Sequence, residues 1–481
     1  MNFKMVLKSL GVLLICEAAA MLPSLIVAFI YKDEGITGFF YTIGIIVVLG
    51  MLLTRVKAES PNMYAKDGFA IVALGWILMS FLGALPFYFS LSIPSLIDSF
   101  FEAVSGFTTT GASILETVEN LPNSLLFWRS FTHWIGGMGV LVLTLAILPS
   151  VNATSIFIMR AESPGPSPGR LVPKVGNTAK ILYGIYLIIT LAQVVLLLIS
   201  GMPLFDSLVH TFGTVGTGGF SIKNMSIGAY NNVFSEVIIT VFMLISGVNF
   251  SLYYQISKGN FKSFFRDEEL RFYTIAVLAS ILLITVNLHG SVFTSLGESL
   301  RHSSFQVASI ITTTGYSSTN FDTWPTLSKL ILFFLMFVGG CAGSTAGGLK
   351  NIRVLLMFKS AKTQLMKIIH PKGVYPVRFG GKVLDEKGLG EIMNFFFMYI
   401  LVFVISVFFI STEGYDMTTT LTSAAATLGN IGPGLSLIGP MGNYSIMSPL
   451  SKIVLSFAML IGRLEIYPIL LLTVPTFWKK D

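Results

Sequence analysis

Long apolar runs separated by short polar connections dominate the hydropathy pattern of this chain. Runs of about 20 residues, the length that spans a bilayer as a helix, recur from SLGVLLICEAAAMLPSLIVAFIY, which begins at about residue 9, to IVLSFAMLIGRLEIYPILLLTV near the end. We count about ten of them. Only 11% of the 481 residues are charged, against ~25% in soluble domains. The pattern predicts an all-α polytopic membrane protein that keeps its first run as a span, because the run is too long for a cleaved signal peptide.

Four short segments rich in glycine and threonine interrupt this pattern about once every 100 residues. Each follows an apolar run, a connection and a short stretch of moderate hydropathy, and each precedes another apolar run. The segments are TTTGA at Gly111, GTGGF at Gly219, TTTGY at Gly315 and GNIGP at Gly432. The chain therefore contains four copies of one unit.

The stretch before each glycine predicts a helix too short to cross the membrane. LIDSFFEAVSGFTTTGAS and LFDSLVHTFGTVGTGGFS align without gaps, so that Asp98-Ser99 and Asp206-Ser207 occupy the same place, where the aspartate or the serine is the predicted helix N-cap. The following dozen residues form a helix of about 18 Å, against about 30 Å of hydrocarbon. Non-helical backbone survives at that depth only if it is buried in protein or lines water. Four such units predict a helix, a re-entrant pore helix and a second helix, arranged four times around a central pore.

This interpretation divides the chain into five parts. They are an extra N-terminal transmembrane helix pair at 1–60 and pore repeats at 61–150, 151–257, 258–359 and 360–481.

The distribution of positive charge predicts the orientation. With loops placed alternately on two sides, 24 of the 31 lysines and arginines fall on one side, including the segments 160–180, 258–271 and 350–387 and both chain ends. This side is predicted to be the cytoplasm. Six fall on the other side (Lys32, Arg129, Lys223, Arg301, Lys329 and Lys452), and Arg463 lies inside a span.

The glycine segments are predicted to form a cation filter. Rings of backbone carbonyls replace the hydration shell of a cation, and glycine enters the positive-φ conformations that turn successive carbonyls toward one axis. The alternative, glycines that only pack helices closely, is assigned to GGMG at 136–139. The residues predicted to bind the cation in this filter are Thr109, Thr110, Gly111, Thr217, Gly218, Gly219, Thr313, Thr314, Gly315, Asn430, Ile431 and Gly432.

A second glycine-rich stretch, GGCAGSTAGG at 339–348, predicts a gate in the third repeat. Its glycines should break the helix there, since each costs about 1 kcal/mol relative to alanine; tight helix packing is the alternative. TLSKLILFFLMFVGG and SPLSKIVLSFAMLIGR align so that Arg463 lies level with Gly340. A charge inside a span faces a cavity or a partner, and a purely structural pairing with Glu465 or a carbonyl is the alternative. The predicted gate residues are Gly339, Gly340, Gly343, Ser344, Thr345, Gly347, Gly348 and Arg463.

Together these residues resemble the Trk/Ktr/HKT superfamily of potassium transporters, specifically the bacterial Trk-H branch. The resemblance is carried by SGFTTTGAS, FWRSFTHWIGGMGVLVLTLAILP, AESPGP, GTGGFS, TTTGYSS, GGCAGSTAGGLKNIR, TLGNIGPG and IGRLEIYP. It implies a potassium pore in the bacterial cytoplasmic (inner) membrane, with one filter glycine per repeat and both termini cytoplasmic. Glycine at all four positions implies potassium rather than sodium. The resemblance also implies a homodimer and a cytoplasmic NAD- or ATP-binding regulatory ring as partner.

Other functions receive less support from the sequence. A proton- or sodium-coupled symporter with alternating access is the alternative, although only Glu17 and Glu465 are acidic residues placed clearly within spans. An enzyme is not predicted, because His133, His210 and His302 lack companions at metal or triad spacing. We expect potassium as the transported ligand, no covalent cofactor and no nucleic-acid partner. The chain has no nucleotide-binding motif, so the nucleotide partner is predicted to dock on the basic segment 350–387, for which anionic lipid is the alternative.

Overall fold

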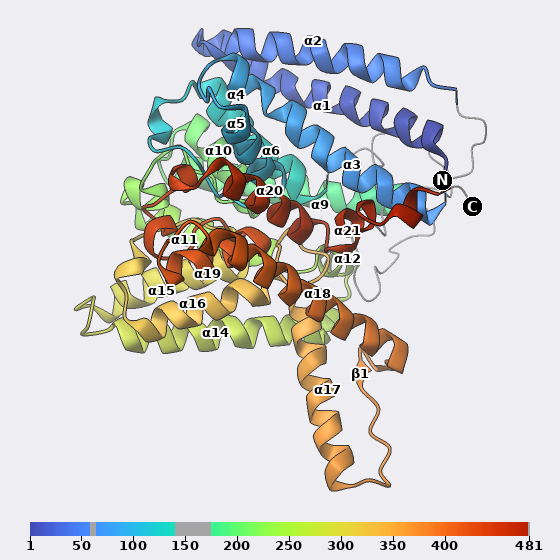
Figure 1. Cartoon of the computed structure of the whole chain (residues 1–481). Helices are drawn as coiled ribbons and strands as arrows, with labels where there is room; N and C mark the ends of the chain where they lie inside the picture. Colours follow the sequence, from blue (N-terminus) through green and yellow to red (C-terminus); the bar gives the residue numbers. More distant parts are fainter. Residues whose placement is uncertain (58–63, 140–174, 480–481) are drawn as a thin grey trace.

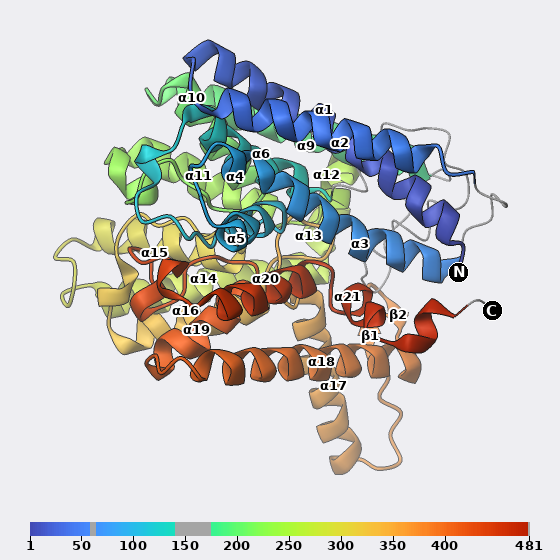
Figure 2. The same ribbon diagram turned by 45° about the horizontal axis from the view of Figure 1, so that its top comes forward.

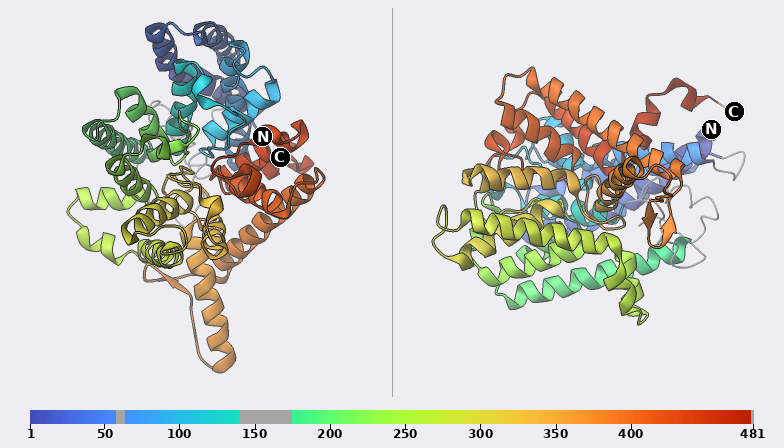
Figure 3. Two further views of the ribbon diagram at one scale, coloured as in Figure 1. Left: turned by 90° about the vertical axis from the view of Figure 1, so that its left-hand side faces the viewer. Right: turned by 90° about the horizontal axis from the view of Figure 1, so that it is seen from below.

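The computed structural model describes residues 1–57, 64–139 and 175–479, and these are mostly helical (Figure 1). Viewed along the long helices, the successive parts of the chain follow one another around a common centre (Figure 3, left). Both termini lie at the same end of the molecule (Figure 1). The motif AESPGP, most of the basic segment 160–180 and the predicted boundary at 150 lie outside the described residues. The prediction of an all-α polytopic protein is confirmed.

An N-terminal helix pair precedes the repeated units. Helix α1 (Phe3–Tyr31) and helix α2 (Gly35–Thr54) pack closely, since Gly11 faces the backbone of Gly50 with no room for a Cβ atom. Helix α1 begins before residue 9, because the side chain of Asn2 caps it by accepting a hydrogen bond from the amide of Met5 (3.2 Å).

Four units of three helices follow. The bounds are α3 (Ala65–Gly83), α5 (Leu96–Phe107) and α6 (Asn123–Gly137); α9 (Val175–Ile199), α10 (Leu204–Val215) and α11 (Val233–Ser246); α14 (Glu268–Leu288), α15 (Leu296–Ile311) and α16 (Thr326–Val338); α18 (Glu386–Ser411), α19 (Met417–Leu428) and α20 (Pro449–Arg463). The middle helices α5, α10 and α19 have 12 residues each and α15 has 16. The expected short pore helix is therefore present in each unit, while the repeat boundaries stay a prediction.

The predicted N-caps of the first two pore helices are wrong. Helix α5 is capped by Ser95, whose Oγ accepts from the amide of Asp98 (3.3 Å), and α10 follows Pro203. Both helices begin earlier than the sequence pattern indicated. Asp98 and Asp206 consequently lie in the first helical turn, where a carboxylate interacts favourably with the helix dipole.

Fewer full-length spans occur than the apolar runs predicted. Among the described residues, six helices are long and apolar enough to cross a membrane, or seven if α11 and α12 (Phe250–Ser257), bent by 92°, count as one. The last helix of each unit is too short for this criterion, because α6, α11, α16 and α20 have 15, 14, 13 and 15 residues. Of these four helices, α16 ends at the glycine-rich segment 339–348.

The remaining elements are short, with one exception. Helix α17 (Asn351–Ile369) runs across the direction of the long helices and extends beyond them, followed by a small hairpin (Figures 1 and 2). The short elements are α4 (Leu85–Phe89), α13 (Phe261–Arg266), α21 (Tyr467–Leu472), β1 (Arg378–Phe379), β2 (Lys382–Val383) and the 3-10 helices Val118–Asn120, Ser226–Tyr230, Phe321–Thr323, Ser436–Ile438, Tyr444–Ile446 and Pro475–Trp478.

Candidate functional site

The four glycine segments adopt one backbone conformation. Each glycine has positive φ, +78° at Gly111 and between +77° and +96° at Gly219, Gly315 and Gly432. The residue two positions earlier also has φ of +55° in all four, although Thr109, Thr217, Thr313 and Asn430 are not glycines. Positive φ is uncommon outside glycine. Its recurrence at the same position in four units makes the segments structurally equivalent.

Hydrogen bonding is equivalent as well. The amide of Thr110, just before the glycine, donates back to the carbonyl of Ser105 in the pore helix (2.9 Å). The corresponding bonds are Gly218 to Gly213 (2.7 Å), Thr314 to Ser309 (2.8 Å) and Ile431 to Ala426 (2.8 Å). Because these four amides point toward the pore helices, the carbonyl groups of the same segments point away from the helices and can interact with another partner.

The segments form a closed ring. A Cβ atom built on Gly111 would lie closer than 3.0 Å to the carbonyl oxygen of Gly218, the residue before the glycine of the second unit. The same relation links the other units in turn: Gly219 with the oxygen of Thr314, Gly315 with that of Ile431, and Gly432 with that of Thr110. The fourth unit thus returns to the first, and no side chain fits at any of the four glycines.

Among the described residues, nearly all carbonyl groups of the ring lack a hydrogen-bond donor. In the part of the chain that the structure describes, the carbonyls of the twelve predicted filter residues accept no protein hydrogen bond, except that Gly432 accepts from the hydroxyl of Tyr444 (2.9 Å). Buried carbonyl groups are normally satisfied. A ring of buried, unpaired carbonyl oxygens provides ligands suited to a dehydrated monovalent cation.

A cavity opens on one side of this ring. It has a volume of about 180 Å³ and is lined by all four glycines together with Arg129, Glu116, Lys223 and Tyr444. The loops that line it connect the pore helices to the last helix of each unit, at the end of the molecule opposite the termini. The cavity is therefore a vestibule leading to the ring.

The predicted glycine break occupies the other side of the ring. Helix α16 ends at Val338 and α17 begins at Asn351, so the residues between them are not helical and the predicted break is confirmed. The amide of Gly347 donates to Oγ1 of Thr313 (2.6 Å), and Gly347 lies against the carbonyl of Gly429. The break thus forms a loop packed directly against the third and fourth glycine segments.

The second unit and the first helix of the loop's own unit hold this loop. The amide of Cys341 donates to the carbonyl of Gly247 (2.9 Å), and Oγ1 of Thr345 donates to the carbonyl of Ser246 (3.2 Å). Glu269 of α14 accepts from the amides of Ala342 (2.7 Å) and Ile352 (3.1 Å), which fixes the two ends of the loop together. The sequence pattern gave no sign of Glu269, because its partners are backbone amides far away in the chain.

Arg463 reaches the loop as the alignment predicted. Its Nη1 donates to the carbonyl of Thr345 (2.8 Å), and its Nη2 donates to the carbonyls of Gly137 (2.9 Å) and Gly136. These partners are all backbone carbonyls, so the alternative of a structural pairing with a carbonyl stays open, while Glu465 pairs with Arg353. Arg463 therefore connects the loop of the third unit to the end of α6 in the first.

The GGMG stretch permits close packing, as expected. A Cβ atom on Gly136 would collide with the carbonyl of Phe107, and one on Gly137 would meet the backbone of Gly216. These glycines bring the end of α6 against the ends of two pore helices. Their carbonyls also accept from Arg463, a role that the sequence did not indicate.

The three histidines without companions at metal or triad spacing, His133, His210 and His302, lie close to the glycine segments. His133 is buried and stacks on Phe220 (centroids 4.2 Å apart), while His210 and His302 contact Ser221 and Ser318 (3.0 and 2.9 Å). Within the described residues no group of three metal-binding side chains is found.

Comparison with known proteins identifies the family. The family described as TrkH, cation transport protein, matches residues 36–480. The chain belongs to the TrkH family. It is 38% identical to the Trk system potassium uptake protein TrkH of Salmonella typhimurium, with both chains covered completely, and 34% identical to TrkG of Escherichia coli K12, covering 98% of this chain and 97% of the relative. The crystal structure of the potassium transporter TrkH from Vibrio parahaemolyticus superposes with a TM-score of 0.89 at 34% identity, with both chains covered completely. Membership of the TrkH family confirms the resemblance and the prediction of a transport protein rather than an enzyme.

Proposed function

We propose that this protein takes up potassium across the bacterial inner membrane through a channel-like pore. Its filter is the ring of carbonyls at the four glycine segments. The observation that supports this most strongly is the cyclic contact in which each filter glycine abuts the carbonyl before the next one. Such a ring replaces the water around a dehydrated cation without any fixed negative charge. The choice of potassium as the transported ion rests on the names of the relatives, which describe potassium uptake.

The loop at 339–350 and Arg463 form the gate in this proposal. The loop lies beneath the ring, and the arginine holds it through the carbonyl of Thr345 while placing a positive charge on the path of a cation. Repulsion of a cation by this charge is strong because the surroundings have a low dielectric constant. Opening requires the loop to move aside, which its glycines allow.

Flux through the purified chain in liposomes tests this function. We expect potassium to move down its electrochemical gradient without a co-ion, so that the reversal potential follows the potassium gradient at any proton or sodium gradient. Protein-free liposomes provide the baseline. Saturable flux that stops when protons and sodium are clamped at equilibrium would instead establish the coupled symporter.

We also propose that regulation comes from a second chain on the cytoplasmic face. Helix α17 carries Lys359, Lys362 and Lys367, extends beyond the bundle and exposes Phe358 and Leu365, so it offers both charge and apolar surface to a partner. The proposed assembly is a homodimer with an NAD- or ATP-binding ring, both termini being cytoplasmic. Potassium is the transported ligand, and the proposal includes no covalent cofactor.

This proposal predicts that nucleotide binds to the partner and not to this chain. We expect NAD or ATP to leave potassium flux through the purified chain unchanged, because nucleotide is read by the partner. Flux is measured in liposomes with and without nucleotide, and anionic-lipid content is varied as a control for the basic surface. A nucleotide response of the purified chain alone would contradict the prediction.

A further inference from the structure

A buried ion pair stands directly behind the ring. Glu102 of α5 and Arg129 of α6 are 1% and 3% exposed, and Nε of Arg129 lies 2.5 Å from Oε1 of Glu102. Charges are rarely buried this deeply unless they are paired and hydrogen-bonded. The charge distribution assigned Arg129 to the side opposite the chain ends, and Arg129 lies in the third helix of the first unit, where it lines the cavity.

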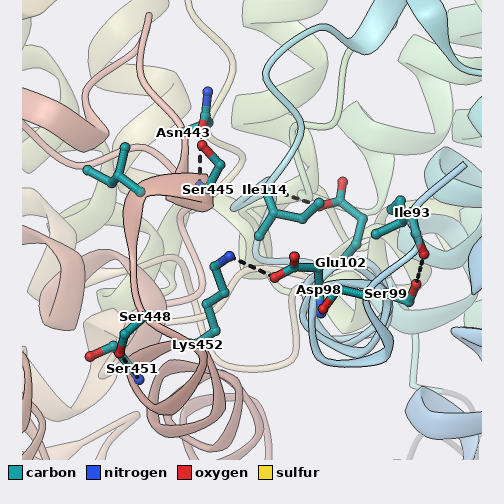
Figure 4. Close-up of polar contacts among 12 residues, drawn as sticks. Ile93, Asp98, Ser99, Glu102, Ile114, Asn443, Ser445, Ser448, Ser451 and Lys452 are labelled. Carbon is teal, nitrogen blue, oxygen red and sulfur yellow. Dashed lines mark hydrogen bonds and ion pairs between the residues drawn. The ribbon is translucent and has the colours of Figure 1, made fainter.

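The glutamate holds the first filter segment just beyond its glycine. Its Oε2 accepts from the amide of Ile114 (3.0 Å), and its Oε1 accepts from Oγ of Ser113 (3.0 Å). Figure 4 shows the side chain of Glu102 joined to Ile114, separately from the neighbouring pair of Asp98 and Lys452. Glu102 therefore determines where the chain leaves the ring after Gly111.

The arginine holds the second filter segment at the same level. Its Nη1 donates to the carbonyl of Ser221 (2.8 Å), and its guanidinium carbon lies 3.5 Å from the centre of the Phe220 ring. Phe220 and Ser221 directly follow Gly219 in the chain. The ion pair thus joins the first and second segments immediately outside their glycines.

Neutral hydrogen bonds join other segments at this level. The hydroxyl of Tyr316 donates to the carbonyl of Phe220 (3.2 Å), and the amide of Tyr444 donates to the carbonyl of Ser113 (2.8 Å). The boundary between the first two units differs because an arginine that also lines the vestibule makes the connection. A positive charge there would repel an entering cation unless Glu102 neutralised it.

We propose that Glu102 and Arg129 are a positioning pair that sets potassium-over-sodium selectivity by fixing the first and second filter segments relative to each other. Glu102 has a second role, which is to cancel the charge of Arg129 at the mouth of the pore. The planar fork of arginine suits these contacts because it can donate to the carboxylate and the carbonyl at once. This inference rests on the proposed filter and adds residues that do not line the ring.

The variant Arg129→Lys tests the positioning role of Arg129 without removing its positive charge. Lysine keeps the charge beside Glu102 but lacks the fork that also reaches Ser221. We expect the potassium-to-sodium permeability ratio to fall about fivefold, the size of effect expected from one lost hydrogen bond, while potassium flux stays within about twofold of the parent. Reversal potentials in mixed potassium and sodium measure the ratio. Arg271→Lys is the matched control, because Arg271 is exposed and its Nε donates only to the carbonyl of Phe265 (2.8 Å) among the described contacts.

Glu102→Gln tests the charge. It leaves Arg129 unneutralised, so we expect potassium flux to fall about tenfold through electrostatic repulsion at low dielectric. The double variant Glu102→Gln with Arg129→Met removes both charges and avoids burying an unpaired one. It should recover potassium flux but keep the lowered permeability ratio, which a purely structural defect would not produce.

The outcomes distinguish this inference from the proposed filter. An unchanged permeability ratio in both Arg129→Lys and the double variant, with Gly111→Ser still lowering it, would overturn the role of the pair and leave the filter intact. If the permeability ratio stayed unchanged in the Glu102 and Arg129 variants and also in Gly111→Ser, the proposed filter itself would be overturned. Monodisperse elution of each variant from size exclusion confirms folding before the ratio is compared.

Discussion

Replacing Gly111 by serine is expected to lower the potassium-to-sodium permeability ratio about tenfold or more. Gly111 has φ of +78°, where a side chain is strained, and its Cβ position is occupied by the carbonyl oxygen of Gly218. Serine must therefore displace an oxygen of the ring in the neighbouring unit. A displacement worth about 1.4 kcal/mol in relative ion binding is already a tenfold change.

Reversal potentials in mixed potassium and sodium measure this effect in liposomes. Gly184→Ser is the matched control, because Gly184 lies in α9 with nothing within 4 Å of its Cβ position and no positive φ. We expect this control to keep the parental ratio. If Gly111→Ser kept it too, Gly111 would not be a filter residue.

Opening the gate should raise flux without changing selectivity. Arg463→Ala removes donors to the carbonyls of Thr345, Gly136 and Gly137, and each hydrogen bond from a charged group contributes about 1.5–3 kcal/mol. If these bonds favour the closed loop, their loss should raise potassium flux about tenfold or more. Deleting residues 343–348 should act in the same direction, because it removes the contact of Gly347 with Thr313.

Potassium and sodium fluxes are compared in liposomes for both variants and the parent. Arg271→Ala serves as a control for loss of an arginine, since Arg271 is exposed in the first turn of α14 and its Nε donates to the carbonyl of Phe265. Variants that elute as folded protein and conduct no better than the parent would show that the gate lies elsewhere. A changed permeability ratio would mean that the loop also supports the filter.

Local patterns predicted much of the architecture. The spacing of the glycine segments predicted four units with short pore helices, and the alignment of two apolar runs placed Arg463 against the break between α16 and α17. These features follow from hydropathy and from residues with special backbone freedom, both of which are visible in a short window of sequence. The same local pattern predicted the wrong start for α5, because the helix is capped by Ser95, three residues before Asp98.

Contacts between units could not be predicted in this way. Glu102 and Arg129 lie on different helices, and each forms a hydrogen bond with a backbone group that follows one of the four glycines. Glu269 joins the two ends of the break through amides of Ala342 and Ile352. No periodicity marks such residues, since their partners are set by how the four units close around the axis. The sequence also does not show that α17 extends away from the bundle. In the structure, Phe358 of this helix is exposed, and the helix carries several lysines.

The most direct measurement of the central claim is the position of a heavy potassium analogue. Crystals of the protein grown in rubidium or thallium should show anomalous density on the axis of the ring, beside the carbonyl oxygens of Thr110, Gly218, Thr314 and Ile431. The density should disappear when the ion is replaced by sodium. Bound ions located only away from these four carbonyls, in crystals where the ring itself is well ordered, would contradict the assignment of the glycine segments as the filter.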